Sequence, residues 1–386
     1  MEKLWRRIWI LGLLFSIWSF FSYSNDWEFG SRGEHILPFK NSKMKIKDEK
    51  IMMKLEEDKS GDFRMKVKVR FVFENEEEGK KIIGFVTPER EDHDAEEENS
   101  GKTKRLGITN FLSKVNGKTV STQQKALQDI LSKGILDKET WEEYQEKKNW
   151  KSDVYYLEAP FFKGENVVEH EYYYTGSYGI FERDFDYILT TISEWKNQKV
   201  ENFELRLDMG NTYFRLPYTF WKNHKKIEWE LLGEGKSVVV EEGENQKRVY
   251  LRMKDGVIRY RAENFAPDKE FRAVVITDSR GTVGQVSNPK HSKYILHDKL
   301  TELFLRIQME DEEFYRGDLE TLTNTELEFL RNYPYAFAGY DFSRKDLKAY
   351  FSQFVWYLPL GTKAPIKKEE VISVVDDILK KRRETK

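Results

Sequence analysis

Apolar and polar side chains alternate along much of the first two thirds of the chain. The clearest case covers residues 63–73, where apolar side chains occupy every second position. Basic residues occupy the first four of the intervening positions, namely Arg64, Lys66, Lys68 and Arg70. A period of two predicts a strand with one buried and one solvated face. Residues 51–55 precede this strand across the turn-forming segment 58–61, so we predict a hairpin.

A second hairpin is predicted where Asn116-Gly117 separates Phe111-Leu112 from Thr119-Val120. Asn-Gly is the pair best able to take positive φ at both central positions of a hairpin turn. Further strands are predicted at 154–157, 167–174, 203–207, 227–231, 238–240, 249–253, 257–260 and 271–276. Together they predict a mainly β, antiparallel and sandwich-like body over residues 25–295.

Two segments interrupt this β pattern. Residues 89–104 are rich in acids and almost devoid of apolar side chains, so we predict a flexible loop. Asp92, Asp94 and Glu96 within it could hold calcium, but they lack the alternating ligand pattern of a calcium loop, which favours a solvated charge run. Residues 122–148 carry apolar side chains at helical spacing, which predicts a helical insertion.

After about residue 295 the apolar period becomes that of helices. Three helical faces are formed by Leu300, Leu303, Phe304 and Ile307; by Leu347, Tyr350, Phe351 and Phe354, after a start signal at Ser343; and by Val371, Val374, Val375, Ile378 and Leu379. Thr323 and Glu326 have the spacing of a capping box at the start of a further helix. We therefore predict an α+β fold in which a small helical module, residues 296–386, follows the β body.

The first 24 residues have the layout of a secretory signal peptide. Basic residues at 3, 6 and 7 precede an apolar stretch at 8–21, and Ser22-Tyr23-Ser24 follows. Fourteen helical residues span about 21 Å, less than the roughly 30 Å of a bilayer core, which favours cleavage after Ser24. The alternative is an uncleaved anchor that carries an extracytoplasmic sensing domain.

The segment 323–358 resembles the YARHG domain, a small module of exported bacterial proteins. The resemblance rests on Arg331-Asn332, on Tyr335-Ala336 with Gly339, and on Tyr350-Phe351 followed by Trp356-Tyr357. The chain departs from the signature at Phe337 and Ala338, where the family has arginine and histidine. Phe337 and Ala338 therefore cannot take over a polar role that the arginine and histidine have in relatives.

The β region resembles the family of unknown function that often precedes YARHG domains in secreted bacterial proteins. The matching features are residues 115–118, 161–162, 168–172, 187–191 with Trp195, 227–229 and 264–267. Both resemblances imply a β-rich exported protein in the periplasm or outside the cell. Neither implies a reaction.

Charge and composition exclude several classes of function. The chain has no cysteine, which excludes disulfides, thiol catalysis and lipid attachment at cysteine. Its formal net charge is −2 and its basic residues form no concentrated stripe, so we predict no nucleic-acid partner. We expect membrane contact only through the transient signal segment.

His170-Glu171 begins like the zinc-binding motif His-Glu-x-x-His, but Tyr174 occupies the position of the second histidine. On a strand, His170 would share a face with the neighbouring tyrosines, so we predict a packed and hydrogen-bonded histidine. The sequence predicts no catalytic residue, no metal ligand and no cofactor.

Aromatic residues make up 15% of the chain and supply the candidates for contact with a partner. These candidates are Tyr172, Tyr174, Tyr178, Tyr335, Trp356 and Tyr357. Flat aromatic rings could form a platform for sugar rings or for another protein. The stronger interpretation is structural, because aromatic side chains favour strands and the small core of a helical module.

The leading hypothesis is a non-enzymatic exported protein that binds a cell-wall or protein partner. The alternative is a hydrolase that acts on an envelope polysaccharide through two carboxylates. Such a pair needs a separation of about 5 to 9.5 Å and leaves no spacing signature in the sequence.

Overall fold

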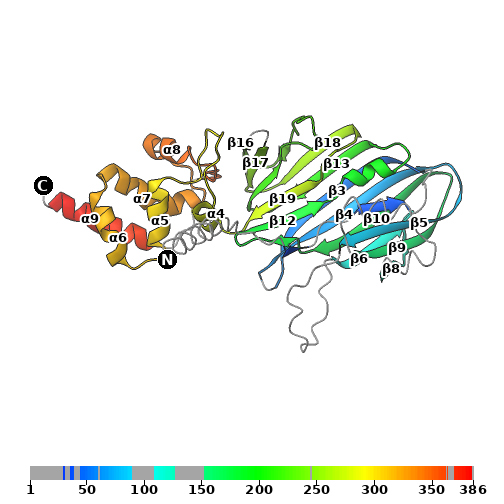
Figure 1. Ribbon diagram of the computed structural model, residues 1–386, viewed down its shortest axis with the longest axis horizontal. Helices are drawn as coiled ribbons and strands as arrows, with labels where there is room; N and C mark the ends of the chain where they lie inside the picture. Colours follow the sequence, from blue (N-terminus) through cyan, green and yellow to red (C-terminus); the bar gives the residue numbers. More distant parts are fainter. Residues whose placement is uncertain are drawn as a thin grey trace, which may run out of the picture.

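The computed structural model describes residues 29–30, 35–38, 44–59, 61–88, 108–126, 152–243, 246–361, 363 and 369–384. The molecule is elongated, with β-sheets at one end and helices at the other (Figure 1). The fold is α+β and mainly β, as predicted. The predicted signal peptide, residues 1–24, and the predicted acidic loop, residues 89–104, lie outside the described residues.

The largest sheet has eight strands. In spatial order they are β15 (Glu230–Leu232), β18 (Val257–Phe265), β13 (Val200–Asp208), β3 (Lys45–Glu57), β4 (Phe63–Asn75), β10 (Gly164–Tyr174), β6 (Ile108–Val115) and β7 (Lys118–Val120). Only β3 and β13 run parallel, and every other neighbouring pair in this sheet is antiparallel.

Two smaller antiparallel sheets complete the β body. The seven-stranded sheet has the order β1 (Phe29–Gly30), β11 (Ser177–Tyr178), β12 (Glu182–Tyr187), β19 (Phe271–Ile276), β14 (Tyr213–Pro217), β17 (Gln246–Met253) and β16 (Gly235–Gly243). The four-stranded sheet has the order β2 (His35–Pro38), β5 (Gly79–Pro88), β9 (Ser152–Phe161) and β8 (Gln123–Ala126). The short 3-10 helix η1 (Thr190–Glu194) follows β12.

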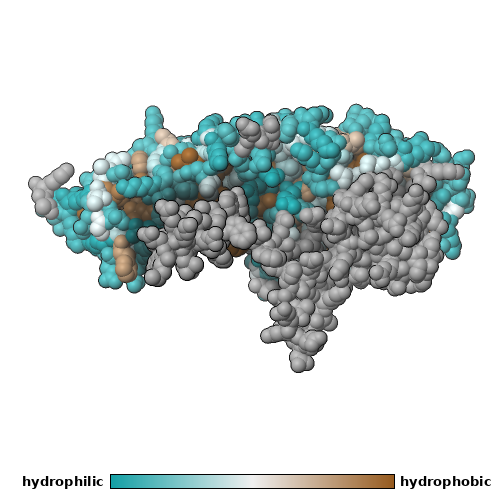
Figure 2. All heavy atoms as spheres, viewed as in Figure 1, coloured by the Kyte–Doolittle hydropathy of each residue, from teal (hydrophilic) through white to brown (hydrophobic). Residues whose placement is uncertain are grey.

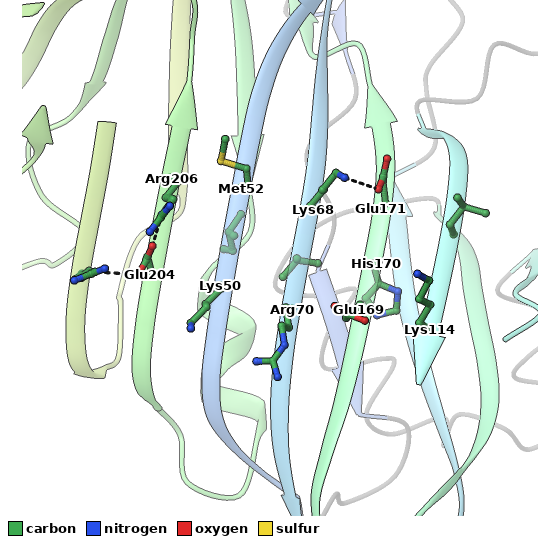
Figure 3. Close-up of a pocket in the computed structure, with 14 residues that line it drawn as sticks. Lys50, Met52, Lys68, Arg70, Lys114, Glu169, His170, Glu171, Glu204 and Arg206 are labelled. Atoms are coloured by element: carbon green, nitrogen blue, oxygen red, sulfur yellow. Dashed lines mark hydrogen bonds and ion pairs between the residues drawn. The ribbon is translucent and has the colours of Figure 1, made fainter. Parts of the chain in front are cut away.

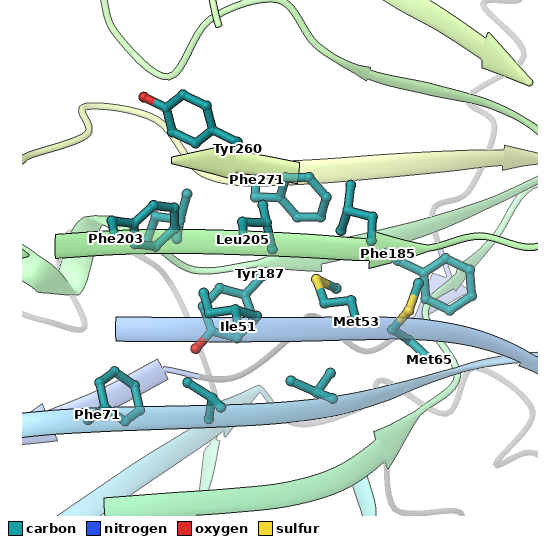
Figure 4. Packing of buried hydrophobic residues seen from close by; sticks show 14 of the residues in the cluster. Ile51, Met53, Met65, Phe71, Phe185, Tyr187, Phe203, Leu205, Tyr260 and Phe271 are labelled. Atoms are coloured by element: carbon teal, nitrogen blue, oxygen red, sulfur yellow. The ribbon is translucent and has the colours of Figure 1, made fainter. Parts of the chain in front are cut away.

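One hydrophobic core joins the three sheets. Met53 and Phe71 point inward from the eight-stranded sheet, Phe185 and Phe271 from the seven-stranded sheet, and Leu157 from the four-stranded sheet. All five are buried, and Figure 4 shows how the first four pack with their neighbours. The sandwich-like body predicted from the alternating pattern is present.

The two predicted hairpins are confirmed. β3 and β4 pair across the turn at 58–61, where Gly61 N donates to the Asp58 carbonyl oxygen. Asn116 and Gly117, with φ of 49° and 78°, connect β6 to β7. Both angles are positive, as a type I′ turn requires.

Two predicted elements need correction. Gln123–Ala126 begins the predicted helical insertion at 122–148 but forms the edge strand β8, because it pairs with β9. The rest of that insertion lies outside the described residues. The strand predicted at 227–231 is observed at Glu230–Leu232. Ile227 is buried and donates its N–H to the Tyr218 carbonyl oxygen, so it does not pair with a neighbouring strand.

Among the described residues, six helices follow the last strand. They are α4 (Ser279–Gln285), α5 (Lys299–Ile307), α6 (Glu312–Thr321), α7 (Asn324–Phe337), α8 (Lys345–Phe351) and α9 (Glu370–Glu384). The capping box of Thr323 and Glu326 is present at the start of α7. The predicted start signal at Ser343 is wrong, because Arg344 is the N-cap of α8. α4 was not predicted.

The surface of the described residues in Figure 2 is mainly hydrophilic, and its hydrophobic side chains gather mostly over the helical end. Two of the most exposed are Met309, which lies between α5 and α6 and is 78% exposed, and Phe314, which lies within α6 and is 63% exposed. Within the described part of the chain, every helix is too short or too polar to span a bilayer.

Gly339 lies where the helical module contacts β17. Its φ is +80°, a conformation that disfavours a side chain. A Cβ at this position would collide with the guanidinium group of Arg252, which donates to the Ala338 carbonyl oxygen at 3.5 Å. Nearby, the Tyr213 hydroxyl donates to the Val355 carbonyl oxygen at 3.3 Å. The glycine of the YARHG-like motif is therefore also the point where the module packs on the β body.

Candidate functional site

The outer face of the eight-stranded sheet carries a groove of about 590 Å³ (Figure 3). It crosses six neighbouring strands, from β6 through β10, β4, β3 and β13 to β18. The side chains that give it its charge are Lys50, Lys68, Arg70, Lys114, Arg206 and Arg261, together with Glu169, Glu171 and Glu204. Six cations against three carboxylates leave a local excess of three positive charges in a chain whose overall charge is −2.

The strand register aligns six of these side chains in one row across the sheet. Lys114 lies opposite Glu169, which lies opposite Arg70, and Arg70 lies opposite Lys50. Beyond Lys50 the row continues through Glu204 to Arg261. We call these six residues, Lys114, Glu169, Arg70, Lys50, Glu204 and Arg261, the charged row. Its members are far apart in the sequence and meet only through the sheet.

Two carboxylates of the groove are neutralised by ion pairs. Glu171 accepts from Lys66 at 2.6 Å and from Lys68 at 3.0 Å. The hydrogen bond from Lys66 is the main cause that holds the pKa of Glu171 below its ordinary value. A carboxylate held in this way stays ionised at neutral pH.

Glu204 is held between two arginines. Arg261 donates to it at 2.9 Å, and Arg206 donates to its other carboxylate oxygen. Partial burial raises the pKa of Glu204, but the two arginine hydrogen bonds outweigh that effect and leave the pKa lowered. Glu204 is therefore a fixed negative charge within the row.

Three cations of the groove are available to a ligand. Within the described part of the chain, Lys50, Arg70 and Lys114 form no ion pair. Lys50 and Arg70 lie directly opposite each other on β3 and β4, an arrangement in which like charges repel. An anion placed between them would relieve that repulsion and gain two charge-assisted hydrogen bonds.

His170 lies beneath the groove on the buried face of β10. It is 2% exposed, and its Nδ1 is 2.8 Å from the Ser113 hydroxyl oxygen. The rings of Phe71 and Phe111 pack against it. Burial lowers the pKa of His170 to about 3, so the imidazole is neutral. The predicted packed and hydrogen-bonded histidine is confirmed.

The aromatic candidates on β10 do not form an exposed platform. Tyr172 and Tyr174 are each 1% exposed and belong to the core of the β body. The Tyr174 hydroxyl donates to the Asp186 carbonyl oxygen at 3.0 Å. Alternation on the strand turns these rings inward, so their proposed contact with a partner is wrong. The side chain of Tyr178 lies outside the described part of the chain.

The candidates in the helical module are also mainly structural. Trp356 and Tyr357 are 4% and 5% exposed, and the Trp356 indole N–H donates to the Leu296 carbonyl oxygen at 2.7 Å. Burial removes both from contact with a partner. Tyr335 is half-buried against the module core, and its role in binding stays a prediction.

Sequence reasoning missed the charged row, although part of its signal was visible. The basic residues between the apolar positions of 63–73 marked the solvated face of one strand. Nothing in the sequence revealed that Lys50 and Lys114 lie beside Arg70, because strand pairing determines that proximity.

Residues 303–380 match the family model of the YARHG domain. This confirms the resemblance seen in segment 323–358 and extends it over α5 to α9. The YARHG domain is typical of exported bacterial proteins. The matched residues cover the helical module and leave the charged groove outside the domain.

A candidate nutrient binding protein from Legionella pneumophila has a similar structure, with a TM-score of 0.52 and 18% sequence identity. The alignment covers 94% of this chain and 100% of that one, so the two share a fold over nearly their whole length. An M1 zinc metallopeptidase from Deinococcus radiodurans aligns at a TM-score of 0.28 and 9% identity over 62% of this chain and 43% of that one, which supports no conclusion. The comparison with curated proteins finds no match.

Proposed function

We propose that this chain is an exported binding protein and that the groove on its eight-stranded sheet holds an anionic ligand of the cell envelope. The observation that carries the proposal is the set of three cations, Lys50, Arg70 and Lys114, that converge on the groove without an ion pair among the described residues. The YARHG match supports export. The similar Legionella protein, a candidate nutrient binder, supports a binding role for this fold.

The electrostatics of two groove carboxylates, Glu171 and Glu204, do not suit the general acid of a hydrolase. A glycoside hydrolase needs one carboxylic acid that stays protonated near neutral pH as well as one carboxylate. The pKa values of Glu171 and Glu204 are both lowered, so neither can serve as that acid. The two residues instead hold the surrounding cations in place.

The test compares the native protein with the double variant Lys50→Ala/Arg70→Ala. Tripolyphosphate serves as a soluble anionic probe, and isolated bacterial envelopes serve as the physiological one. We expect the double variant to bind tripolyphosphate at least about tenfold more weakly, because two charge-assisted contacts are lost. Binding by the native protein should weaken as salt rises.

Lys236→Ala/Lys254→Ala is the matched control, since it removes two exposed cations from the seven-stranded sheet and its adjoining turn. It should bind both probes like the native protein. Equal binding by the groove variant and the native protein would contradict the proposal. So would recovery of all native protein in the supernatant after mixing with envelopes. Release of sugar fragments from the envelopes would favour the hydrolase instead.

A further inference from the structure

The charged row has a length and a direction that specify the shape of the ligand. Resting on the proposed anion-binding function, we infer that the ligand is an extended polyanion that lies across the strands and carries phosphate groups at regular intervals. A compact anion would occupy only the centre of the groove. The row offers contacts well beyond that centre.

The row crosses six strands at right angles to their direction. Neighbouring strands are about 4.8 Å apart, so the row is roughly 24 Å long. Lys114 lies at one end, Lys50 and Arg70 lie in the middle, and Arg261 lies at the other end. The cations thus recur along the row, with two strand spacings from Lys114 to Arg70 and two from Lys50 to Arg261.

Carboxylates separate these cations. Glu169 lies between Lys114 and Arg70, and Glu204 lies between Lys50 and Arg261. A uniformly charged rod would meet repulsion at both carboxylates. A chain whose charges are spaced by neutral linkers can place anions on the cations and linkers over the carboxylates.

Apolar side chains in the groove suit such linkers. Met52 lies in the adjacent register row between Lys68 and Arg206, and Leu112 is 59% exposed beside Glu171. Both belong to the groove lining. They offer contact area to the uncharged part of a polymer without competing for its charges.

The groove lacks the feature that nucleic acids and neutral sugars use. Among its described lining residues there is no phenylalanine, tyrosine or tryptophan. Single-stranded nucleic acids gain much of their affinity from base stacking on aromatic rings. The lining therefore favours a flexible phosphodiester chain with neutral, non-aromatic linkers, which is recognised by its charge.

A chain-length series tests this inference. Binding of inorganic phosphate, tripolyphosphate and long-chain poly(glycerol phosphate), whose phosphates are separated by neutral glycerol units, is measured for the native protein at fixed salt, with an oligothymidylate of equal charge alongside. We expect affinity per molecule to rise at least about tenfold from tripolyphosphate to the long chain, because later contacts form at high effective concentration. The oligothymidylate should bind more weakly than the long poly(glycerol phosphate).

Lys114→Ala separates an extended ligand from a compact one, since Lys114 lies at the end of the row and is exposed. It should weaken long-chain binding by about threefold or more and reduce the salt dependence by about one charge, and its effect on tripolyphosphate binding should be smaller than that of Lys50→Ala/Arg70→Ala. Lys236→Ala, outside the groove, should change neither.

The outcomes are distinguishable. Equal affinity for tripolyphosphate and the long chain would overturn the extended ligand and leave the proposed anion site standing. Failure of every anion to bind would overturn both. Tighter binding of the oligothymidylate than of the long poly(glycerol phosphate) would overturn the assigned class of polymer.

Discussion

On the inner face of β4, Val69 and Phe71 are each 3% exposed within the core of the β body, whereas Lys68 and Arg70 on the outer face of the same strand line the groove. The inner face holds apolar side chains that contact two other sheets. The outer face holds charges that contact one another or face solvent. The difference indicates that the two faces meet separate demands, since packing determines the fold on one side and the other side is free to bind.

Glu49 and His170 are titratable groups among the polar side chains buried on the inner face of the eight-stranded sheet. Glu49 is 3% exposed and lies in register between Phe71 and Phe203. Within the described residues, its Oε2 atom has no hydrogen-bond partner. His170, also on this face, is buried beside Ser113. These two groups make the stability of the packed face dependent on pH.

The largest expected effect comes from removing a ring on the inner face. Phe71→Ala should reduce the free energy of unfolding by about 3 to 5 kcal/mol, because it removes buried area and leaves a cavity against Phe73 and His170. Denaturant unfolding followed by tryptophan fluorescence measures this change.

Arg70→Ala, one residue earlier on the opposite face, is the matched comparison. It should change the free energy of unfolding by no more than about 0.5 kcal/mol and should weaken anion binding. A loss of several kcal/mol from Arg70→Ala would show that the outer face is also needed for folding, and the separation of the two faces would fail.

A smaller effect is expected from the pH dependence of Glu49. Burial raises the pKa of Glu49 from 4.5 in the unfolded chain to about 8 in the folded protein. The folded state therefore holds the proton more tightly, and stability falls as pH rises from about 4.5 to about 8. His170 acts in the opposite direction, because burial lowers its pKa from 6.5 to about 3, so its contribution rises between those values.

Comparison of the native protein with Glu49→Gln from pH 6.5 to 8 isolates Glu49, since His170 is present in both and its contribution cancels. Across this pH range the native protein should lose about 1.5 kcal/mol more stability than Glu49→Gln, whose side chain does not titrate. Denaturant unfolding at several pH values measures both slopes. Parallel slopes for the two proteins would mean that Glu49 is ionised and solvated in the folded state.

How far the sequence predicts this molecule depends on the range of the interaction. The alternation at 63–73 predicted β4 correctly, because a strand that is buried on one face shows its period locally. Thr323 and Glu326 predicted the start of α7 for the same reason, since a capping box spans one turn. These features need no knowledge of the neighbouring strands.

Predictions from the sequence fail where the pairing of distant strands determines the structure. The apolar spacing that begins at Ala126 resembled a helix, yet Gln123–Ala126 extends the edge of a sheet. Tyr172 and Tyr174 were possible binding residues until the register placed them against the core. The charged row combines side chains from six strands, so no local pattern could reveal it.

A change in stability of less than about 1 kcal/mol is also expected from Glu171→Gln, and this variant sharpens the comparison of the faces. Glu171 is 33% exposed and its partners Lys66 and Lys68 are 22% and 57% exposed, so each of the two ion pairs should contribute less than about 1 kcal/mol. Glu171→Gln should therefore unfold at nearly the same denaturant concentration as the native protein.

The same substitution would free Lys66 and Lys68 to contact a ligand, and it would raise the net charge of the groove by one. Long-chain poly(glycerol phosphate) should bind more tightly to Glu171→Gln at low salt, and the gain should shrink as salt screens the added charge. A variant that unfolds like the native protein but binds no more tightly would place the anion away from Lys68, toward Lys50 and Arg70.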